Sequence, residues 1–129
     1  MKGEPGNEIL SMIENAYAAF NRRDIDGALA AMKPDVQWSN GWRGGYVYGH
    51  SGVRDYWRQQ WKEIDPTVKP VRITMKDDGR VKVRVEQIIR QADGALLRAG
   101  LVDHVYTLSD GLIAQMDIEE LARTGNEPQ

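Results

Sequence analysis

The 129 residues fit one domain with a single hydrophobic core, because two domains of ordinary size would need a longer chain. The 17 basic residues are nearly balanced by 19 acidic ones, so the chain lacks the broad positive charge that attracts a nucleic-acid backbone. It contains no cysteine, which excludes disulfides, thiolate metal ligands and cysteine nucleophiles.

Two further patterns are missing from the sequence. No stretch approaches the roughly 18 apolar residues that a membrane-spanning helix needs. The first residues, MKGEPGNE, lack the apolar core of a secretory signal. We therefore expect a cytoplasmic protein with neither nucleic acid nor membrane as a partner.

Two amphipathic helices are predicted at the start of the chain. Between Glu8 and Arg22 the apolar residues share one helical face, and they are Ile9, Ile13, Ala16, Tyr17 and Phe20. Asp24 is placed to cap a second helix. Its apolar residues keep the helical spacing and are Ile25, Ala28, Leu29 and Met32. Pro34 is expected to end this helix.

A short strand, a glycine-rich segment and a third helix are predicted next. Val36 and Trp38 alternate with polar residues, which indicates a short edge strand. Residues 40–49 contain four glycines together with Trp42, Tyr46 and Tyr48, a pattern that fits either a lid over a pocket or a plain hairpin loop. The third helix is expected to start at a Ser51 cap and to end at Pro66. Its inner face carries Val53, Tyr56, Trp57, Gln60, Trp61 and Ile64.

After Pro70 the spacing of the apolar residues changes from helical to alternating. Three turn sequences that end in glycine, at residues 77–79, 92–94 and 109–111, divide this part into four strands. Strands that are joined by tight turns pair with their neighbours in antiparallel fashion. The sequence therefore predicts an antiparallel meander.

The order of these elements predicts an α+β fold in one domain, residues 1–129, with an ordered core at about 8–121. A sheet with one apolar face has to bury that face, and the three N-terminal helices are available to cover it. The native twist of the strands curves such an antiparallel sheet into a cone. We expect one apolar pocket between the cone and the helices.

Three segments carry a family resemblance: AYAAFNRRDIDGALAAMKPDVQW, YGHSGVRDYW and DHVYTLSDGLIAQMDI. In this order they resemble the nuclear transport factor 2-like superfamily, in its branch of ketosteroid isomerases and SnoaL-like polyketide cyclases. The resemblance implies a cone-shaped fold that binds a small hydrophobic or cyclic ligand. It does not select a reaction, because this fold carries isomerases, cyclases, hydratases and proteins without catalytic activity.

The resemblance also implies where the catalytic residues of a ketosteroid isomerase would stand. Ala16 occupies the position of the tyrosine that binds the oxyanion, and Asn40 lies near the position of the carboxylate base. Tyr17 is one residue away from the tyrosine position, which is a rotation of about 100° on a helix. The sequence therefore disfavours steroid isomerisation by the carboxylate mechanism.

The third isomerase position, an aspartate on a long strand, matches either Asp103 or His104. The letters select Asp103, whereas the spacing to the following turn selects His104. Side chains alternate across a strand, so only one of the two faces the pocket. The apolar residues in phase with His104 are Val102, Tyr106 and Leu108. We therefore expect His104 to face inward.

His104 is the first candidate catalytic residue, because an imidazole inside the cone can transfer a proton near neutral pH. Gln87 is the second candidate, since it interrupts a face of valines and isoleucines on the neighbouring strand. A buried amide without a partner costs about 1 to 3 kcal/mol, so Gln87 needs His104, a water molecule or a ligand. Two interpretations stay open: a proton-transfer site, or a structural hydrogen bond between Gln87 and His104.

The predicted wall of the pocket combines rings from the helices with inward-facing residues of the sheet. Its members are Tyr17, Phe20, Trp38, Asn40, Trp57, Trp61, Val85, Tyr106, Met116, Ile118 and Glu120. Tyr106 could also polarise a ligand oxygen, and Glu120 is either an acid, a partner of His104 or a solvated charge at the rim. We predict no metal site and no cofactor, because the histidines lack carboxylates at ligand spacing and no phosphate-binding or dinucleotide motif occurs.

Two functions fit these observations. One is an enzyme that performs general acid/base chemistry of the isomerase, cyclase or hydratase type on a small apolar or cyclic substrate. The other is a non-catalytic module that holds a ligand or forms a dimer. The outer face of the sheet is polar, with Arg72, Arg84 and Glu86, and would suit a hydrated homodimer contact.

Overall fold

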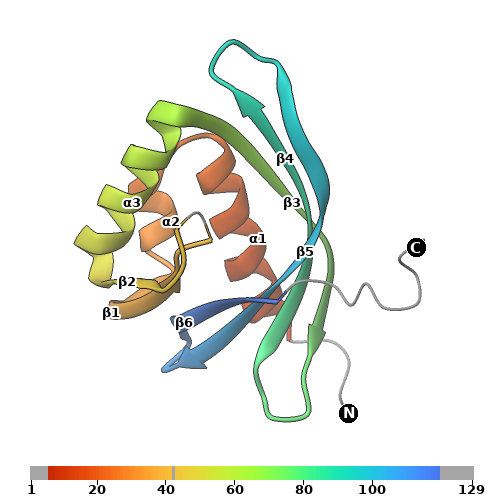
Figure 1. Cartoon of the computed structure of the whole chain (residues 1–129). Coiled ribbons are helices and arrows are strands. Elements are labelled where there is room, and N and C mark those ends of the chain that lie inside the picture. Colours follow the sequence, from red (N-terminus) through yellow and green to blue (C-terminus); the bar gives the residue numbers. More distant parts are fainter. Residues whose placement is uncertain (1–5, 42, 120–129) are drawn as a thin grey trace.

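The computed structural model describes residues 6–41 and 43–119, in which three helices pack against one six-stranded sheet. Figure 1 shows the sheet curving around the helices, which lie on its concave side. The strand order is β2-β1-β6-β5-β4-β3, so the sheet remains open between β2 and β3. The predicted α+β cone is confirmed.

The first two helices form where they were predicted to begin, but the second ends at Leu29, before Met32 and Pro34. They are α1 (Asn7–Asn21) and α2 (Ile25–Leu29). Asp24 caps α2, because its carboxylate accepts a hydrogen bond of 2.9 Å from the backbone N–H of Gly27. A β-carbon on Gly27 would lie 2.4 Å from a carboxylate oxygen of Asp24, so the cap requires glycine at that position.

Strand β1 (Met32–Ser39) begins where the second helix was predicted to continue, and Pro34 lies inside this strand. Proline cannot donate to a sheet ladder, and the register between β1 and β6 (Leu112–Glu119) is interrupted around it. The prediction of an edge strand is also wrong. β2 (Tyr46–Tyr48) pairs with one side of β1, and β6 runs parallel to it on the other side.

The segment at 40–49 is a hairpin connection, since β2 folds back on β1 in antiparallel fashion. Trp42, which was predicted to belong to it, lies outside the described residues. The following helix, α3 (Gly49–Glu63), begins before Ser51, so this serine does not cap it. None of the helices in the described part of the chain is both long enough and apolar enough to cross a membrane.

The second half of the chain is the predicted meander. β3 (Ile64–Met75), β4 (Val81–Gln91), β5 (Leu96–Ser109) and β6 pair in sequence order, and each pair is antiparallel. Gly79, Gly94 and Gly111 have positive φ angles of 79° to 95° at the three turns. Glycine adopts this conformation without strain, which explains why each predicted turn ends in it.

β3 starts at Ile64, earlier than the change of spacing behind Pro70 suggested. Pro66 and Pro70 both lie within this strand. They are tolerated because β3 is an edge strand, where one row of backbone N–H groups needs no partner in the sheet. The seven residues 64–70 therefore belong to the strand although the sequence pattern did not predict it, and Pro66 does not end a helix.

The inner face of the sheet supplies most of the buried core. Val81, Val83 and Val85 of β4 have no exposed surface, and they pack in one cluster with helix residues such as Ile13 and Val53. The apolar residues in the alternating pattern of β4 are thus the side chains that the helices cover.

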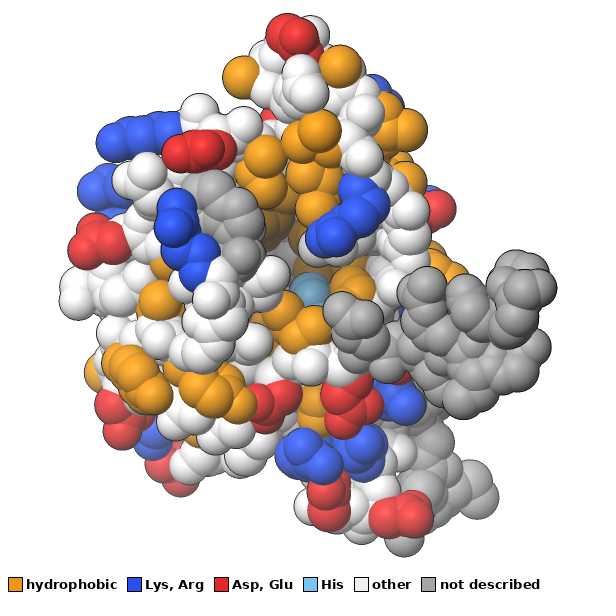
Figure 2. Space-filling view, in the orientation of Figure 1, with side chains coloured by type: hydrophobic (Ala, Val, Ile, Leu, Met, Phe, Trp, Pro, Cys, Tyr) orange, Lys and Arg blue, Asp and Glu red, His pale blue; other side chains and the backbone are white. Residues whose placement is uncertain are grey.

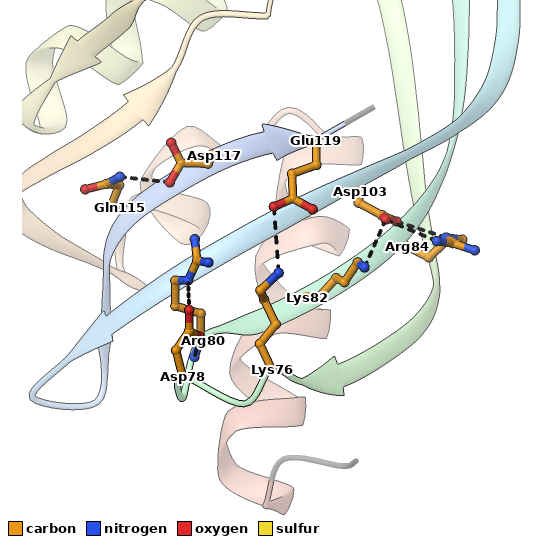
Figure 3. Close-up of polar contacts among 9 residues, drawn as sticks. All are labelled: Lys76, Asp78, Arg80, Lys82, Arg84, Asp103, Gln115, Asp117 and Glu119. Atoms are coloured by element: carbon orange, nitrogen blue, oxygen red, sulfur yellow. Dashed lines mark hydrogen bonds and ion pairs between the residues drawn. The ribbon is translucent and has the colours of Figure 1, made fainter. Parts of the chain in front are cut away.

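The outer face of the sheet carries a network of charges, which Figure 3 shows on β4, β5 and β6. Asp103 is only 3% exposed and accepts hydrogen bonds of 2.9 and 3.1 Å from the guanidinium of Arg84. The ammonium of Lys82 lies 3.6 Å from the same carboxylate. Burial by itself would raise the pKa of Asp103, but Arg84 and Lys82 outweigh it and hold that pKa below its ordinary value.

Candidate functional site

A cavity of about 580 Å³ lies between the concave face of the sheet and the helices. Its size is within the range of small-molecule sites. Figure 2 looks into a hollow on this side of the molecule, and hydrophobic side chains form most of its visible wall. Its exposed lining residues are Gly41 and the stretch 98–101 of β5, so the cavity opens at that side.

Aromatic rings form a continuous part of the cavity wall. Phe20 contacts Trp57 edge to face at 5.1 Å between ring centroids, and Trp57 contacts Trp38 in the same manner at 5.6 Å. Trp38 in turn lies 6.2 Å from the ring of Tyr106. Rings in these geometries hold one another in place, so the wall is rigid and suits a flat apolar molecule.

Three polar groups interrupt the apolar wall and are joined in one hydrogen-bonded chain. The hydroxyl of Tyr106 donates to the hydroxyl of Tyr17 at 2.7 Å, and the hydroxyl of Tyr17 lies 2.8 Å from Nδ1 of His104. The rings of Tyr17 and His104 are stacked at 5.9 Å with an interplanar angle of 7°. All three side chains line the cavity, and each is at most 8% exposed.

Burial keeps all three groups uncharged. It lowers the pKa of His104 from 6.5 to about 4, and the neighbouring charge of Asp103 only partly opposes this change. Burial also raises the pKa of Tyr106, and it raises that of Tyr17 well above 10, with a further increase from the nearby Tyr106. At neutral pH the site therefore presents a neutral imidazole and two neutral phenols.

Strand alternation places His104 in the cavity and Asp103 on the outer face. His104 pairs with Val83, a core residue, whereas Asp103 pairs with Arg84 on the opposite side of β4. This is the orientation that the apolar neighbours of His104 predicted.

Most of the predicted wall residues do line the cavity. They are Tyr17, Phe20, Trp38, Trp57, Tyr106, Met116 and Ile118, together with His104 and Gln87. Three predicted residues do not line it. Val85 is fully buried in the core, Trp61 packs behind Trp57 and Phe20, and Asn40 lies in the hairpin loop, where its side chain accepts a hydrogen bond from the backbone of Arg43. Glu120 lies outside the described residues.

The structural hydrogen bond proposed between Gln87 and His104 is wrong. Gln87 pairs with Gly100, whereas His104 pairs with Val83, so the two lie four residues apart along the sheet. At about 3.3 Å per residue this is roughly 13 Å, beyond the reach of a hydrogen bond. The partner of His104 is Tyr17, and Gln87 contributes an amide to the wall nearer the opening.

Two features of the site escaped the sequence analysis. The first is the hydrogen bond between Tyr17 and Tyr106, which were both predicted only as wall residues, because the family pattern aligns Ala16, and not Tyr17, with the tyrosine that binds the oxyanion. The second is the stretch of β5 at the opening, where Arg98 and Gly100 both line the cavity. They stand in phase with His104, so the same alternation that oriented His104 could have identified them.

The arrangement can orient an oxygen-bearing ligand and transfer protons without separating charge. Within residues 6–41 and 43–119, no cluster of three histidine or acidic side chains offers a metal site. The imidazole of His104 and the phenols of Tyr17 and Tyr106 can each donate or accept a hydrogen bond.

Comparison with known proteins agrees with this architecture. The family model of the SnoaL-like domain matches residues 13–116. No curated protein sequence matches the chain.

Several solved structures share the fold. TerC, which was co-crystallised with polyporic acid, has a TM-score of 0.78 at 24% identity and covers 89% of this chain and 92% of its own. An NTF2-like protein of unknown function from Burkholderia pseudomallei has a TM-score of 0.77 at 23% identity, covering 90% and 92%. An LEH-like epoxide hydrolase of Mycobacterium tuberculosis has a TM-score of 0.70 at 21% identity, covering 86% and 80%.

The match of the family model spans most of the chain and includes the strands and helices that build the cavity. At this level of identity the solved structures establish the fold alone. The chain belongs to the SnoaL-like family.

Proposed function

We propose that the protein is an enzyme that binds a small, flat, largely apolar carbonyl compound and moves a proton between a carbon atom and the carbonyl oxygen. The observation that carries this proposal is the hydrogen-bonded chain of Tyr106, Tyr17 and His104 in the wall of an apolar cavity. Burial disfavours charge on each of the three groups, so a mechanism that keeps them neutral suits the site best.

The hydrogen-bonded chain of His104, Tyr17 and Tyr106 supports such a mechanism. Before the reaction, Nδ1–H of His104 donates to Tyr17, Tyr17 donates to Tyr106, and Tyr106 donates to the carbonyl oxygen of the ligand. The proton of the ligand's C–H group then moves to Nε2, each proton of the chain moves one place, and the hydroxyl proton of Tyr106 ends on the ligand oxygen. The ligand becomes an enol. Tyr106 now donates to Tyr17, as in the structure, so both hydroxyls rotate when the next carbonyl oxygen binds.

The geometry favours a single carbonyl group of the ligand, with its neighbouring C–H group, that contacts His104 and Tyr106 at the same time. The rings of His104 and Tyr106 lie only 6.3 Å apart between centroids. Enol formation beside a carbonyl is a common step in double-bond migration, in ring closure by carbon–carbon bond formation, and in loss of water from a β-hydroxy carbonyl compound. Isomerase, cyclase and hydratase reactions therefore all follow from the same proton transfer.

Binding and proton transfer can be tested in two steps. A thermal-shift series with cyclic aryl ketones such as tetralones detects binding, because a ligand of the folded state raises its stability by RT ln(1 + [L]/Kd). Nuclear magnetic resonance in deuterium oxide then measures exchange of the protons beside the carbonyl. We expect Tyr106→Phe to slow this exchange by about a hundredfold, in the range of general acid catalysis.

The matched control is Tyr48→Phe, which changes a tyrosine that is 62% exposed on β2 and does not line the cavity. This variant should exchange protons as fast as the unaltered protein. Ketones that bind but exchange no faster than in buffer would rule out the catalytic part of the proposal.

A non-catalytic binding module is the second candidate function. The pKa of about 4 favours it, because an imidazole with so low a pKa is a weak base at neutral pH. Binding without proton exchange, unaffected by Tyr106→Phe, would support this function.

We also propose that two copies of the chain form a homodimer through the outer face of the sheet. Glu86 of β4 and Leu101 of β5 are register partners in phase with Arg84 and Asp103 on this face, and Leu101, which also borders the cavity opening, is 50% exposed, so the face offers both polar and apolar contact surface. Sedimentation velocity over a range of concentrations tests this, and a monomer at every concentration would contradict it. A cytoplasmic location stays a prediction.

A further inference from the structure

One charged side chain lines the cavity among the described residues. It is Arg98 on β5, and the other lining residues are apolar or carry neutral polar groups such as hydroxyls, amides and an imidazole. Arg98 is exposed and lies at the opening of the cavity, so the desolvation free energy of its charged guanidinium is small.

Arg98 and the neutral site lie at opposite ends of one row of side chains. Arg98, Gly100, Val102 and His104 alternate along β5 on its inner face, and Arg98 pairs with Ile89, which also lines the cavity. Six residues separate Arg98 from His104, which is roughly 20 Å at about 3.3 Å per residue. The arginine side chain is long, so a molecule that binds both its guanidinium and the tyrosine pair can be shorter than this backbone distance.

Among residues 6–41 and 43–119, nothing competes with a ligand for the guanidinium of Arg98. Within the described chain no hydrogen bond or ion pair engages it. By contrast, Arg23, Arg54, Arg80 and Arg84 each pair with an aspartate. A guanidinium matches the planar geometry of a carboxylate and can bind both of its oxygens at once.

The path between the two ends is open. A β-carbon built on Gly100 would have no atom within 4 Å, so the strand presents empty space at this point of the wall. A flat molecule can therefore lie against β5 at Gly100, between Arg98 and the part of the cavity that Val102 and His104 line.

We infer that the cavity selects a ligand with two different oxygen functions, a neutral carbonyl or hydroxyl group at the tyrosine pair and a carboxylate at Arg98. The substrate class is then a flat, mostly apolar keto or hydroxy carboxylic acid, and Arg98 is its specificity-determining residue. This inference rests on the proposed function, in that the cavity must bind a small molecule.

Two rigid probes test the inference. One is a biphenyl with a hydroxyl at one end and a carboxylate at the other, and the second carries a carboxamide in place of the carboxylate. Calorimetry should show about fivefold tighter binding of the carboxylate, in line with a partly exposed ion pair. Arg98→Gln should abolish this preference and leave the affinity for the carboxamide unchanged. Arg90→Gln, which removes a charge from the neighbouring strand outside the cavity, should retain it.

Each alternative result has a distinct meaning. If both probes bind but the carboxylate has no advantage, or keeps it in Arg98→Gln, the inference is overturned and the proposed function stands. If the cyclic ketones bind and neither biphenyl does, the inference is also overturned, and the proposed function still stands. If neither the ketones nor the biphenyls bind to the unaltered protein, the proposed function and the inference fail together. Circular dichroism and the melting temperature establish that the variants are folded.

Discussion

Replacing His104 by glutamine is expected to make the protein more resistant to acid. The unfolded chain takes up a proton on this residue as the pH falls through 6.5, whereas the folded protein does so only near pH 4. Between these values the unfolded state binds more protons, so acid shifts the equilibrium toward unfolding. The destabilisation that His104 causes is therefore negligible at neutral pH and grows as the pH falls toward 4.

The size of this effect follows from the burial of the residue. His104 is 8% exposed, so water screens its imidazole little, and a change of pKa from 6.5 to about 4 corresponds to between about 3 and 4 kcal/mol at about 1.4 kcal/mol per pKa unit. About 3 kcal/mol of this is lost between pH 7 and pH 4, because the folded protein is half protonated on His104 at pH 4. Glutamine does not titrate, yet it can still accept the hydrogen bond of Tyr17. The variant should therefore lose about 3 kcal/mol less stability than the unaltered protein between pH 7 and pH 4.

Urea denaturation at half-unit steps of pH measures this difference directly, because all other titrating groups are common to the two proteins. His50→Gln is the matched control, since it changes the histidine outside the cavity and leaves His104 in place. A constant difference between His104→Gln and the unaltered protein over this range would refute the reasoning. It would mean that His104 reaches water in the folded state.

Three further substitutions separate the cavity from its surroundings. Gly100→Leu should fill the open part of the wall and weaken binding of the cyclic ketones by more than tenfold, with an unchanged or higher melting temperature, because leucine is the better strand residue. Asp103→Asn should cost about 1 kcal/mol in urea denaturation, since Arg84 loses its ionic partner but remains partly exposed to water, while ligand affinity stays the same. Asp24→Ala should cost about 1 kcal/mol through loss of the α2 cap, and an unchanged midpoint would show that the cap contributes nothing.

The part of the fold that local chemistry determines could be predicted from the sequence. The turns at Gly79, Gly94 and Gly111 need a positive φ angle, and their glycines identify the meander without further information. The same holds for the Asp24 cap, whose partner is only three residues away. Here the physical cause and its signal lie in the same short segment.

Predictions failed where a distant strand decides the outcome. Pro34 and Pro66 looked like the ends of helices, but each lies in a strand. The register gap opposite β6 accommodates Pro34, and the free edge of β3 accommodates Pro66. Neither circumstance is visible within the segment that contains the proline.

The site shows the same division. Alternation along β5 was sufficient to orient His104, because the period of a strand is fixed. The identity of its partner was not predictable, since Tyr17 lies 87 residues away in the sequence and meets His104 only after α1 has packed against the sheet. Gln87, which is much closer to His104 in the sequence, was therefore wrongly predicted as its hydrogen-bond partner.

Asp103 and His104 divide one strand between an ionic exterior and an uncharged interior. If β5 lost or gained a single residue ahead of them, the two would exchange places. A carboxylate would enter the cavity, the imidazole would meet solvent, and Arg84 would face no acid. Two proteins of this architecture with opposite acid–base character can thus differ by one deletion, without any change in the residues that face each other across the remaining strands.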